Sequence, residues 1–115
     1  MKEFKPKVII SPRFCNLMSV FINVYAITIY PFVISRERLD ITIYNHEKIH
    51  LVQQRELWVV GFYILYMWYW LKAVAMGNTG RDAYYAIPFE KEAYENDKNL
   101  KYLKTRKPHA WKTYL

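Results

Sequence analysis

The chain has few of the residues that build disulfide-linked, collagen-like or low-complexity proteins: one cysteine, three glycines and five prolines in 115 residues. A single Cys15 excludes an internal disulfide, a cysteine-rich zinc finger and an iron–sulfur site. The low glycine and proline content excludes collagen-like and repetitive classes. Because 53% of the residues are hydrophobic, a disordered chain is excluded as well. The length is that of one domain, which we expect to span residues 1–115.

Acidic residues are also scarce. The chain has 17 Lys and Arg against 10 Asp and Glu, a formal net charge of +7. Basic residues gather near the ends, at 1–13 and 98–112, whereas the runs 14–35 and 57–71 carry no charge. Basic ends around apolar runs favour an anionic membrane surface over nucleic acid, for which the sequence has no motif. Ordinary solubilising charge is the alternative. We expect no cleavable signal peptide, because no small-residue cleavage site follows a clean apolar core.

The first uncharged run predicts β-structure. It is long enough to cross a bilayer as a helix, but it contains polar residues and a proline, and Val20–Ile29 is dense in Val and Ile. We therefore favour a strand over a transmembrane helix. The tetrad Ile-Thr-Ile-Tyr occurs at 27–30 and again at 41–44, which indicates a hairpin or two neighbouring strands. These features predict a short N-terminal antiparallel sheet.

A helical period follows the second tetrad, with Asn45 as the expected N-cap. We expect this helix to continue through the uncharged run 57–71. Seven of the residues in 57–76 are aromatic, which is typical of a helix at a membrane interface. We interpret this segment as membrane-inserted or membrane-lying, with a buried core helix as the alternative. The sequence Gly77-Asn78-Thr79-Gly80 is expected to break the helix.

A last helix is expected from Phe89 to Arg106, with Pro88 in its first turn and Pro108 beyond its end. A short sheet followed by two or three helices belongs to the α+β class.

One motif contains candidate metal-ligating and catalytic residues. His46-Glu47-Lys48-Ile49-His50 is a His-Glu-x-x-His sequence on an expected helix. Residues four apart lie on the same helical face, so the imidazoles of His46 and His50 can converge on one metal ion. Glu47 is offset by one residue, which allows it to act as general base on a metal-bound water without being a ligand. Zn²⁺ suits this donor set.

A zinc site needs a third protein ligand, and the acidic start of the last helix supplies two candidates, Glu90 and Glu92. They lie about 200° apart around a helix, so only one of them can face the metal. Acidic residues in a first helical turn also stabilise the helix dipole without any metal, which is the structural alternative. His109 lies in the basic tail beside Pro108, and we expect it to be exposed rather than a ligand.

These residues resemble a known family. A His-Glu-x-x-His helix, a hydrophobic helix and a helix bearing a Glu ligand follow one another in gluzincin-type zinc metallopeptidases. His46 to Gln54 is also similar to the His-Glu-x-x-His-x-x-Gln-Gln stretch of small bacterial zinc peptidases, and Glu90 to Tyr94 to their later Glu-x-Glu-Ala motif. The resemblance covers about residues 26–97 and implies a minimal zincin-like core. It includes a strand, Ala26–Ile34, of the kind that pairs with extended substrate in gluzincins.

The resemblance leaves the third ligand open. In CAAX-type integral-membrane proteases the ligand Glu lies three residues before the Ala, which corresponds to Glu90 here. The Asp that usually follows the Ala is Tyr94 in this chain, a departure from the pattern. If Glu92 is the ligand instead, Asn96 could take the supporting role of that Asp. We favour Glu90.

By resemblance, the chain is a zinc-dependent metallopeptidase with Glu47 as general base. An oxyanion donor could come from Arg81, Tyr84 or Tyr85, and Gln53 or Gln54 could hydrogen-bond within the site or only pack.

Two other readings stay open: a catalytically silent zincin-like binding or structural protein, and a small basic membrane protein in which the motif is accidental. We expect a peptide or protein substrate, a membrane surface or bilayer, and an oligomer or partner protein. The expected location is at the bacterial inner membrane or its cytoplasmic face.

Overall fold

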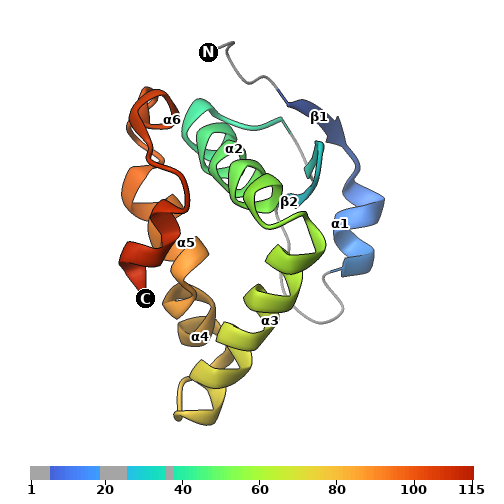
Figure 1. Cartoon of the computed structure of the whole chain (residues 1–115). Helices are drawn as coiled ribbons and strands as arrows, with labels where there is room; N and C mark the ends of the chain where they lie inside the picture. Colours follow the sequence, from blue (N-terminus) through green and yellow to red (C-terminus); the bar gives the residue numbers. More distant parts are fainter. Residues whose placement is uncertain (1–5, 19–25, 36–37) are drawn as a thin grey trace.

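The computed structural model describes residues 6–18, 26–35 and 38–115. Within these ranges the chain has a mixed α+β architecture, as expected (Figure 1). The elements are, in chain order, β1 (Lys7–Ile10), α1 (Pro12–Met18), β2 (Ala26–Ile29), β3 (Phe32–Ser35), α2 (Ile41–Glu56), α3 (Val60–Ala75), α4 (Gly80–Ala86), α5 (Pro88–Asn96), α6 (Tyr102–Thr105) and the short 3-10 helix η1 (Ala110–Tyr114). Helix α2 lies between the sheet on one side and α5 on the other (Figure 1).

The sheet has three strands in the order β1-β3-β2. Strand β2 runs antiparallel to β3, with Thr28 opposite Val33, but β1 runs parallel to β3, with Val8 opposite Val33. The expectation of a purely antiparallel sheet is therefore wrong. A parallel pair needs a crossover connection, and α1 lies in the connection that follows β1. The part of the expected strand at residues 20–25 lies outside the described residues.

The expected strand Ala26–Ile34 is two strands, β2 and β3, joined by a tight turn at Tyr30 and Pro31. Proline has no N–H to donate to a ladder, so it favours a turn between strands over the interior of one long strand. The second Ile-Thr-Ile-Tyr tetrad is not a strand at all, because Ile41–Tyr44 forms the first turn of α2.

Helix α2 begins earlier than the sequence predicts. Its N-cap is Asp40, whose Oδ1 accepts a hydrogen bond from the N–H of Ile43 at 2.9 Å. Asn45, the expected cap, lies inside the helix and donates from Nδ2 to the carbonyl oxygens of Asp97 (2.8 Å) and Asn99 (3.1 Å). These bonds tie α2 to the end of α5.

The expected continuous helix through 57–71 is also wrong. The chain turns by 110° between α2 and α3, and both Trp58 (φ 60°) and Val59 (φ 63°) have positive φ. The N–H of Val60 bonds the carbonyl of Trp58 at 2.6 Å, which closes a γ-turn centred on Val59. Within the described residues no single helix is both long and apolar enough to cross a membrane. The bent pair α2 and α3 together passes that test by length and composition.

The core next to the site is aromatic. Phe62 of α3, Ile87, Phe89 of α5 and Trp111 of η1 form one buried cluster. Gly77 follows α3 with a φ of +99°, which confirms the expected break. Pro88 is in the first turn of α5, also as expected, but α5 ends at Asn96 and not at Arg106. The chain after Asn96 folds back as α6 and η1.

Candidate metal centre

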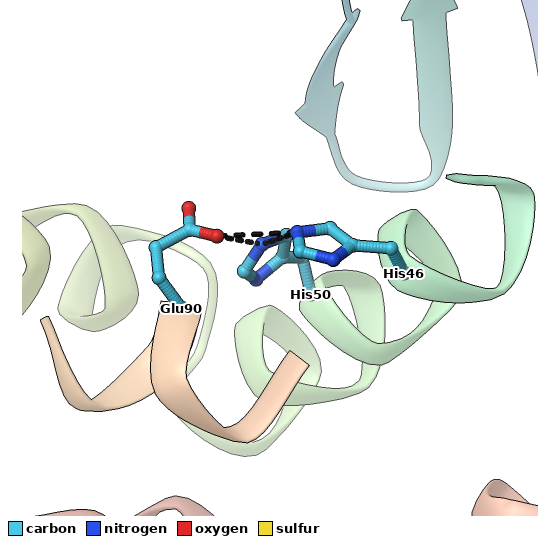
Figure 2. Close-up of side chains that lie close together, drawn as sticks. All are labelled: His46, His50 and Glu90. Carbon is cyan, nitrogen blue, oxygen red and sulfur yellow. Dashed lines mark hydrogen bonds and ion pairs between the residues drawn. The ribbon is translucent and has the colours of Figure 1, made fainter. Parts of the chain in front are cut away.

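Helices α2 and α5 bring three ligand atoms together (Figure 2). The Nε2 atoms of His46 and His50 are 3.1 Å apart. Glu90 Oε1 lies 3.1 Å from His46 Nε2 and 2.9 Å from His50 Nε2. All three side chains are buried, with exposed fractions of 4–6%. This group could hold a metal ion.

The outer nitrogens of both imidazoles face hydrogen-bond acceptors. His46 Nδ1 lies 3.1 Å from Asp97 Oδ2, and His50 Nδ1 lies 2.8 Å from Gln53 Oε1. The Gln53 amide is oriented by its Nε2, which donates to the Phe89 carbonyl at 3.1 Å and to Glu92 Oε1 at 2.9 Å. Both Nδ1 atoms therefore carry the hydrogen, and in the neutral rings both Nε2 atoms present lone pairs.

When both rings are neutral, three lone-pair donors converge on one point, an arrangement that a metal ion or a proton between them stabilises. Tetrahedral Zn²⁺ with bonds of about 2.0–2.1 Å would hold its ligand atoms about 3.3 Å apart. The observed separations of 2.9–3.1 Å are close to that spacing. The chemistry of the donor set, two imidazoles and one carboxylate, also fits zinc.

A proton is the competitor of a metal ion at this point. Burial raises the pKa of Glu90, but the charges and hydrogen bonds of His50 and His46 outweigh burial and lower that pKa well below its usual range. Burial lowers the pKa of His50, but the charge and hydrogen bond of Glu90 raise it to about 9. A cation next to Glu90 is therefore favourable, whether it is an imidazolium or a metal.

Glu47 differs from Glu90 in its environment. Burial raises the pKa of Glu47, and the positive charges of His50 and His46 partly oppose that effect. Among the described residues, the Glu47 carboxylate has no hydrogen bond and no ion pair. A buried carboxylate beside the histidines with a raised pKa and free lone pairs is able to accept a proton.

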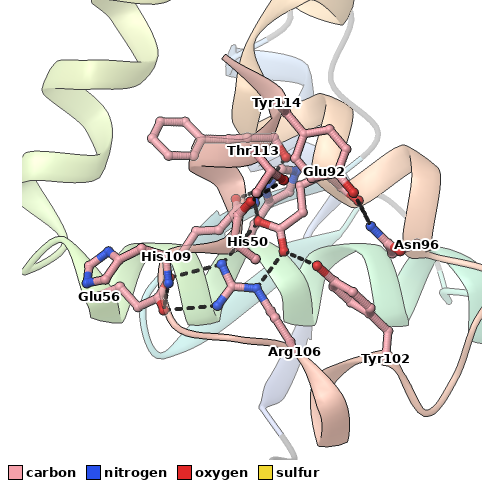
Figure 3. A network of polar contacts seen from close by, with 12 residues as sticks. His50, Glu56, Glu92, Asn96, Tyr102, Arg106, His109, Thr113 and Tyr114 are labelled. Carbon is pink, nitrogen blue, oxygen red and sulfur yellow. Dashed lines mark hydrogen bonds and ion pairs between the residues drawn. The ribbon is translucent and has the colours of Figure 1, made fainter.

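Glu92 is not part of this group. Its carboxylate accepts hydrogen bonds from Arg106 Nη2 (3.1 Å), from the Tyr102 hydroxyl (2.6 Å) and from Gln53 (2.9 Å) (Figure 3). Arg106 also pairs with Glu56 at 3.0 Å. Glu92 therefore ties the C-terminal segment to α5 and α2, while Glu90 lies with the histidines.

Sequence reasoning missed two residues that contact the ligand group. Asp97 orients His46, and it lies seven residues after Glu90, a spacing that returns to the same helical face. Tyr66 of α3 donates from its hydroxyl to Glu90 Oε2 at 2.7 Å, which turns Oε1 toward the histidines. Tyr66 had no sequence signal, because it is one of 11 tyrosines in the chain.

The expected oxyanion donors lie on α4. The Tyr84 hydroxyl is 2.9 Å from that of Tyr94, and the Tyr94 ring packs against His46 with centroids 4.4 Å apart. Tyr85 and Arg81 are exposed. Asn96, considered as a partner of Glu92, donates to the Glu92 carbonyl at 2.8 Å and to the Tyr114 hydroxyl at 3.1 Å.

The structure places His109 and Gln54 outside the ligand group. His109 is half-buried, and its backbone N–H donates to Glu56 Oε2 at 2.7 Å, so the expectation of an exposed tail residue is wrong. Gln54 Nε2 donates to the Thr28 carbonyl at 3.2 Å, and Gln54 Oε1 accepts from the Tyr30 N–H at 3.0 Å. The Thr28 carbonyl of β2 and the Tyr30 N–H of the following turn are therefore engaged with α2.

Comparison of the chain with protein-family models, with curated proteins and with solved structures found no match. The likeness to gluzincins therefore rests on the motif and its spacing. The α+β class is shown by the structure, whereas the zincin-like core stays a prediction.

Proposed function

We propose that this chain binds Zn²⁺ through His46, His50 and Glu90 and hydrolyses peptide bonds. The convergence of three ligand atoms from α2 and α5, with both imidazoles turned to present Nε2, carries the proposal. Within the described residues the group has three ligand side chains, which leaves one tetrahedral position for water or substrate, as in catalytic zinc sites.

A bound zinc ion would lower the pKa of a coordinated water and polarise the scissile carbonyl. The side chains supply the proton transfers. Glu47, with its raised pKa, takes a proton from the attacking water and later donates it to the leaving amine. Tyr66 and Asp97 are positioning residues, because each contacts a ligand and fixes its orientation.

The low exposure of the three ligands favours a second candidate, a catalytically silent zinc-binding protein. Exposed fractions of 4–6% leave little room for a substrate to approach the metal in this conformation. Zinc that a substrate cannot reach would stabilise the fold rather than catalyse a reaction. Both functions require bound zinc, and only the peptidase requires Glu47 as general base.

The first experiment is zinc stoichiometry by elemental mass spectrometry on the wild type and on His46→Ala, Glu90→Gln and Glu92→Gln. One zinc per chain is expected, lost in His46→Ala and Glu90→Gln and retained in Glu92→Gln. The matched glutamates make the test specific, because both are buried on α5. Absence of zinc from folded wild type after reconstitution would refute the metal site.

The second experiment separates hydrolase from silent binder. The zinc-loaded wild type is incubated with a library of fluorogenic peptides beside zinc-loaded Glu47→Gln. Cleavage by the wild type that falls by two orders of magnitude or more in Glu47→Gln, with zinc retained, supports the peptidase. No cleavage by either protein, at full zinc occupancy, supports the silent binder.

A further inference from the structure

Helix α3 has an exposed apolar face. Six large hydrophobic residues recur along it at helical spacing, each 37–66% exposed: Val60, Ile64, Met67, Trp68, Leu71 and Val74. Trp58, just before the helix, is 89% exposed. Single exposed hydrophobic residues are ordinary, but a continuous face of this length marks an interaction surface.

The opposite face of α3 is already occupied. Phe62 and Ala73 are buried, and Phe62 packs against Phe89 with ring centroids 4.7 Å apart. The Tyr66 hydroxyl bonds Glu90, and Tyr63 donates to the Thr28 carbonyl. These contacts fix the rotation of the helix about its axis, so the apolar face stays directed away from the protein.

The charge around this face indicates which kind of partner would bind it. Residues 57–81 contain no Asp or Glu, while Lys72 and Arg81 are exposed. The whole chain carries a formal net charge of +7. Such a surface would be repelled by a second copy of the same charge and attracted to anionic lipid headgroups. Trp58 and Trp68 are of the residue type that prefers the boundary between headgroups and acyl chains.

We propose that the outer face of α3 lies on the surface of an anionic lipid bilayer, with Ile64 and Leu71 inserted below the headgroups and Lys72 at their level. Because the inner face of α3 carries Tyr66 against Glu90, the metal group would lie about one helix diameter, roughly 10 Å, from the bilayer. If the chain is a hydrolase, as proposed above, its substrates are then membrane-associated polypeptides. The docking itself does not depend on that function.

The test is flotation with lipid vesicles, without added metal or peptide. Vesicles of phosphatidylcholine alone are compared with vesicles containing roughly 30% phosphatidylglycerol. Ile64→Glu is the test variant, and Ile41→Glu is its matched control, because both isoleucines are 64% exposed and Ile41 lies at the far end of α2. Leu71→Glu repeats the test if Ile64→Glu fails to fold by circular dichroism. Lys72→Glu tests the charge.

We expect the wild type and Ile41→Glu to float with the anionic vesicles, and Ile64→Glu and Leu71→Glu to bind about tenfold more weakly or worse. Lys72→Glu should weaken binding to anionic vesicles only. Failure of the wild type to bind either vesicle would overturn the proposal. So would equal binding by Ile64→Glu, because the basic ends would then account for it. A dimer in sedimentation equilibrium that Ile64→Glu dissociates, without vesicle binding, would assign the face to a second copy.

Discussion

His50 and Gln53 lie one helical turn apart on α2, and the imidazole Nδ1 donates to the amide Oε1 at 2.8 Å. This bond directs the other nitrogen of His50 toward His46 and Glu90. Gln53→Leu removes the acceptor, so we expect the zinc affinity to fall about 10- to 100-fold. A competition titration with a chromophoric chelator measures the change.

Gln54 provides the matched control, since it is the next residue, equally buried, and bonded to Thr28 and not to a ligand. Gln54→Leu should lower stability and leave the zinc affinity of the folded protein within about threefold of wild type. An equal loss of affinity in both variants would show that Gln53 acts only through packing.

Zinc affinity should depend on pH through His50. Its pKa in the metal-free group is raised to about 9, so the ring carries a proton at neutral pH that zinc must displace. Affinity should therefore rise about tenfold per pH unit between about pH 7 and pH 8 and level off above the His50 pKa. Calorimetric titration in buffers of different ionisation enthalpy should show one proton released. A flat pH profile would contradict the assignment.

The Glu92 network should make the fold acid-sensitive. Burial raises the pKa of Glu92, but hydrogen bonds from Arg106, Tyr102 and Gln53 outweigh burial and lower that pKa. A lowered carboxyl pKa contributes stability above the unfolded pKa of about 4.3, and this stability is lost as pH falls through the folded value.

Glu92→Gln should therefore cost about 1–3 kcal/mol at neutral pH and progressively less as the pH falls below 4.3. Urea unfolding followed by circular dichroism measures the difference at each pH. Glu95 is an exposed residue on the same helix, so Glu95→Gln is the control and should change stability little at each pH. If Glu92→Gln lowered the free energy of unfolding equally at every pH, the loss would come from altered packing and not from the charge of the carboxylate.

A substitution in the α2–α3 turn should increase the stability of the fold. Val59 has φ 63° and ψ −61°, a conformation that strains a β-branched residue by about 1–3 kcal/mol. Glycine adopts positive φ without that strain, so Val59→Gly should stabilise the fold despite the lost side chain. Val60→Gly, at the first helical residue of α3, should destabilise it. A higher melting temperature for Val59→Gly together with a lower one for Val60→Gly would support the strained turn. Lower melting temperatures for both variants would argue against it.

Local patterns in the sequence were sufficient for several features. The i, i+4 spacing of His46 and His50 places both rings on one helical face in any fold that keeps the helix. Pro88 at the start of α5 and the break after α3 follow equally from backbone chemistry that acts within a few residues. The α+β class follows from the change of hydrophobic period along the chain.

Only the tertiary structure decided which residues meet those histidines. Phe89, Glu90, Glu92 and Ala93 are all buried on α5, so hydrophobicity alone does not reveal which face of that helix is turned toward α2. Packing of Phe89 against Phe62 and Trp111 sets the rotation of α5, which brings Glu90 to His46 and His50 and leaves Glu92 to Arg106. Helical spacing is a property of one segment, whereas the rotation of a helix depends on contacts with segments distant in sequence.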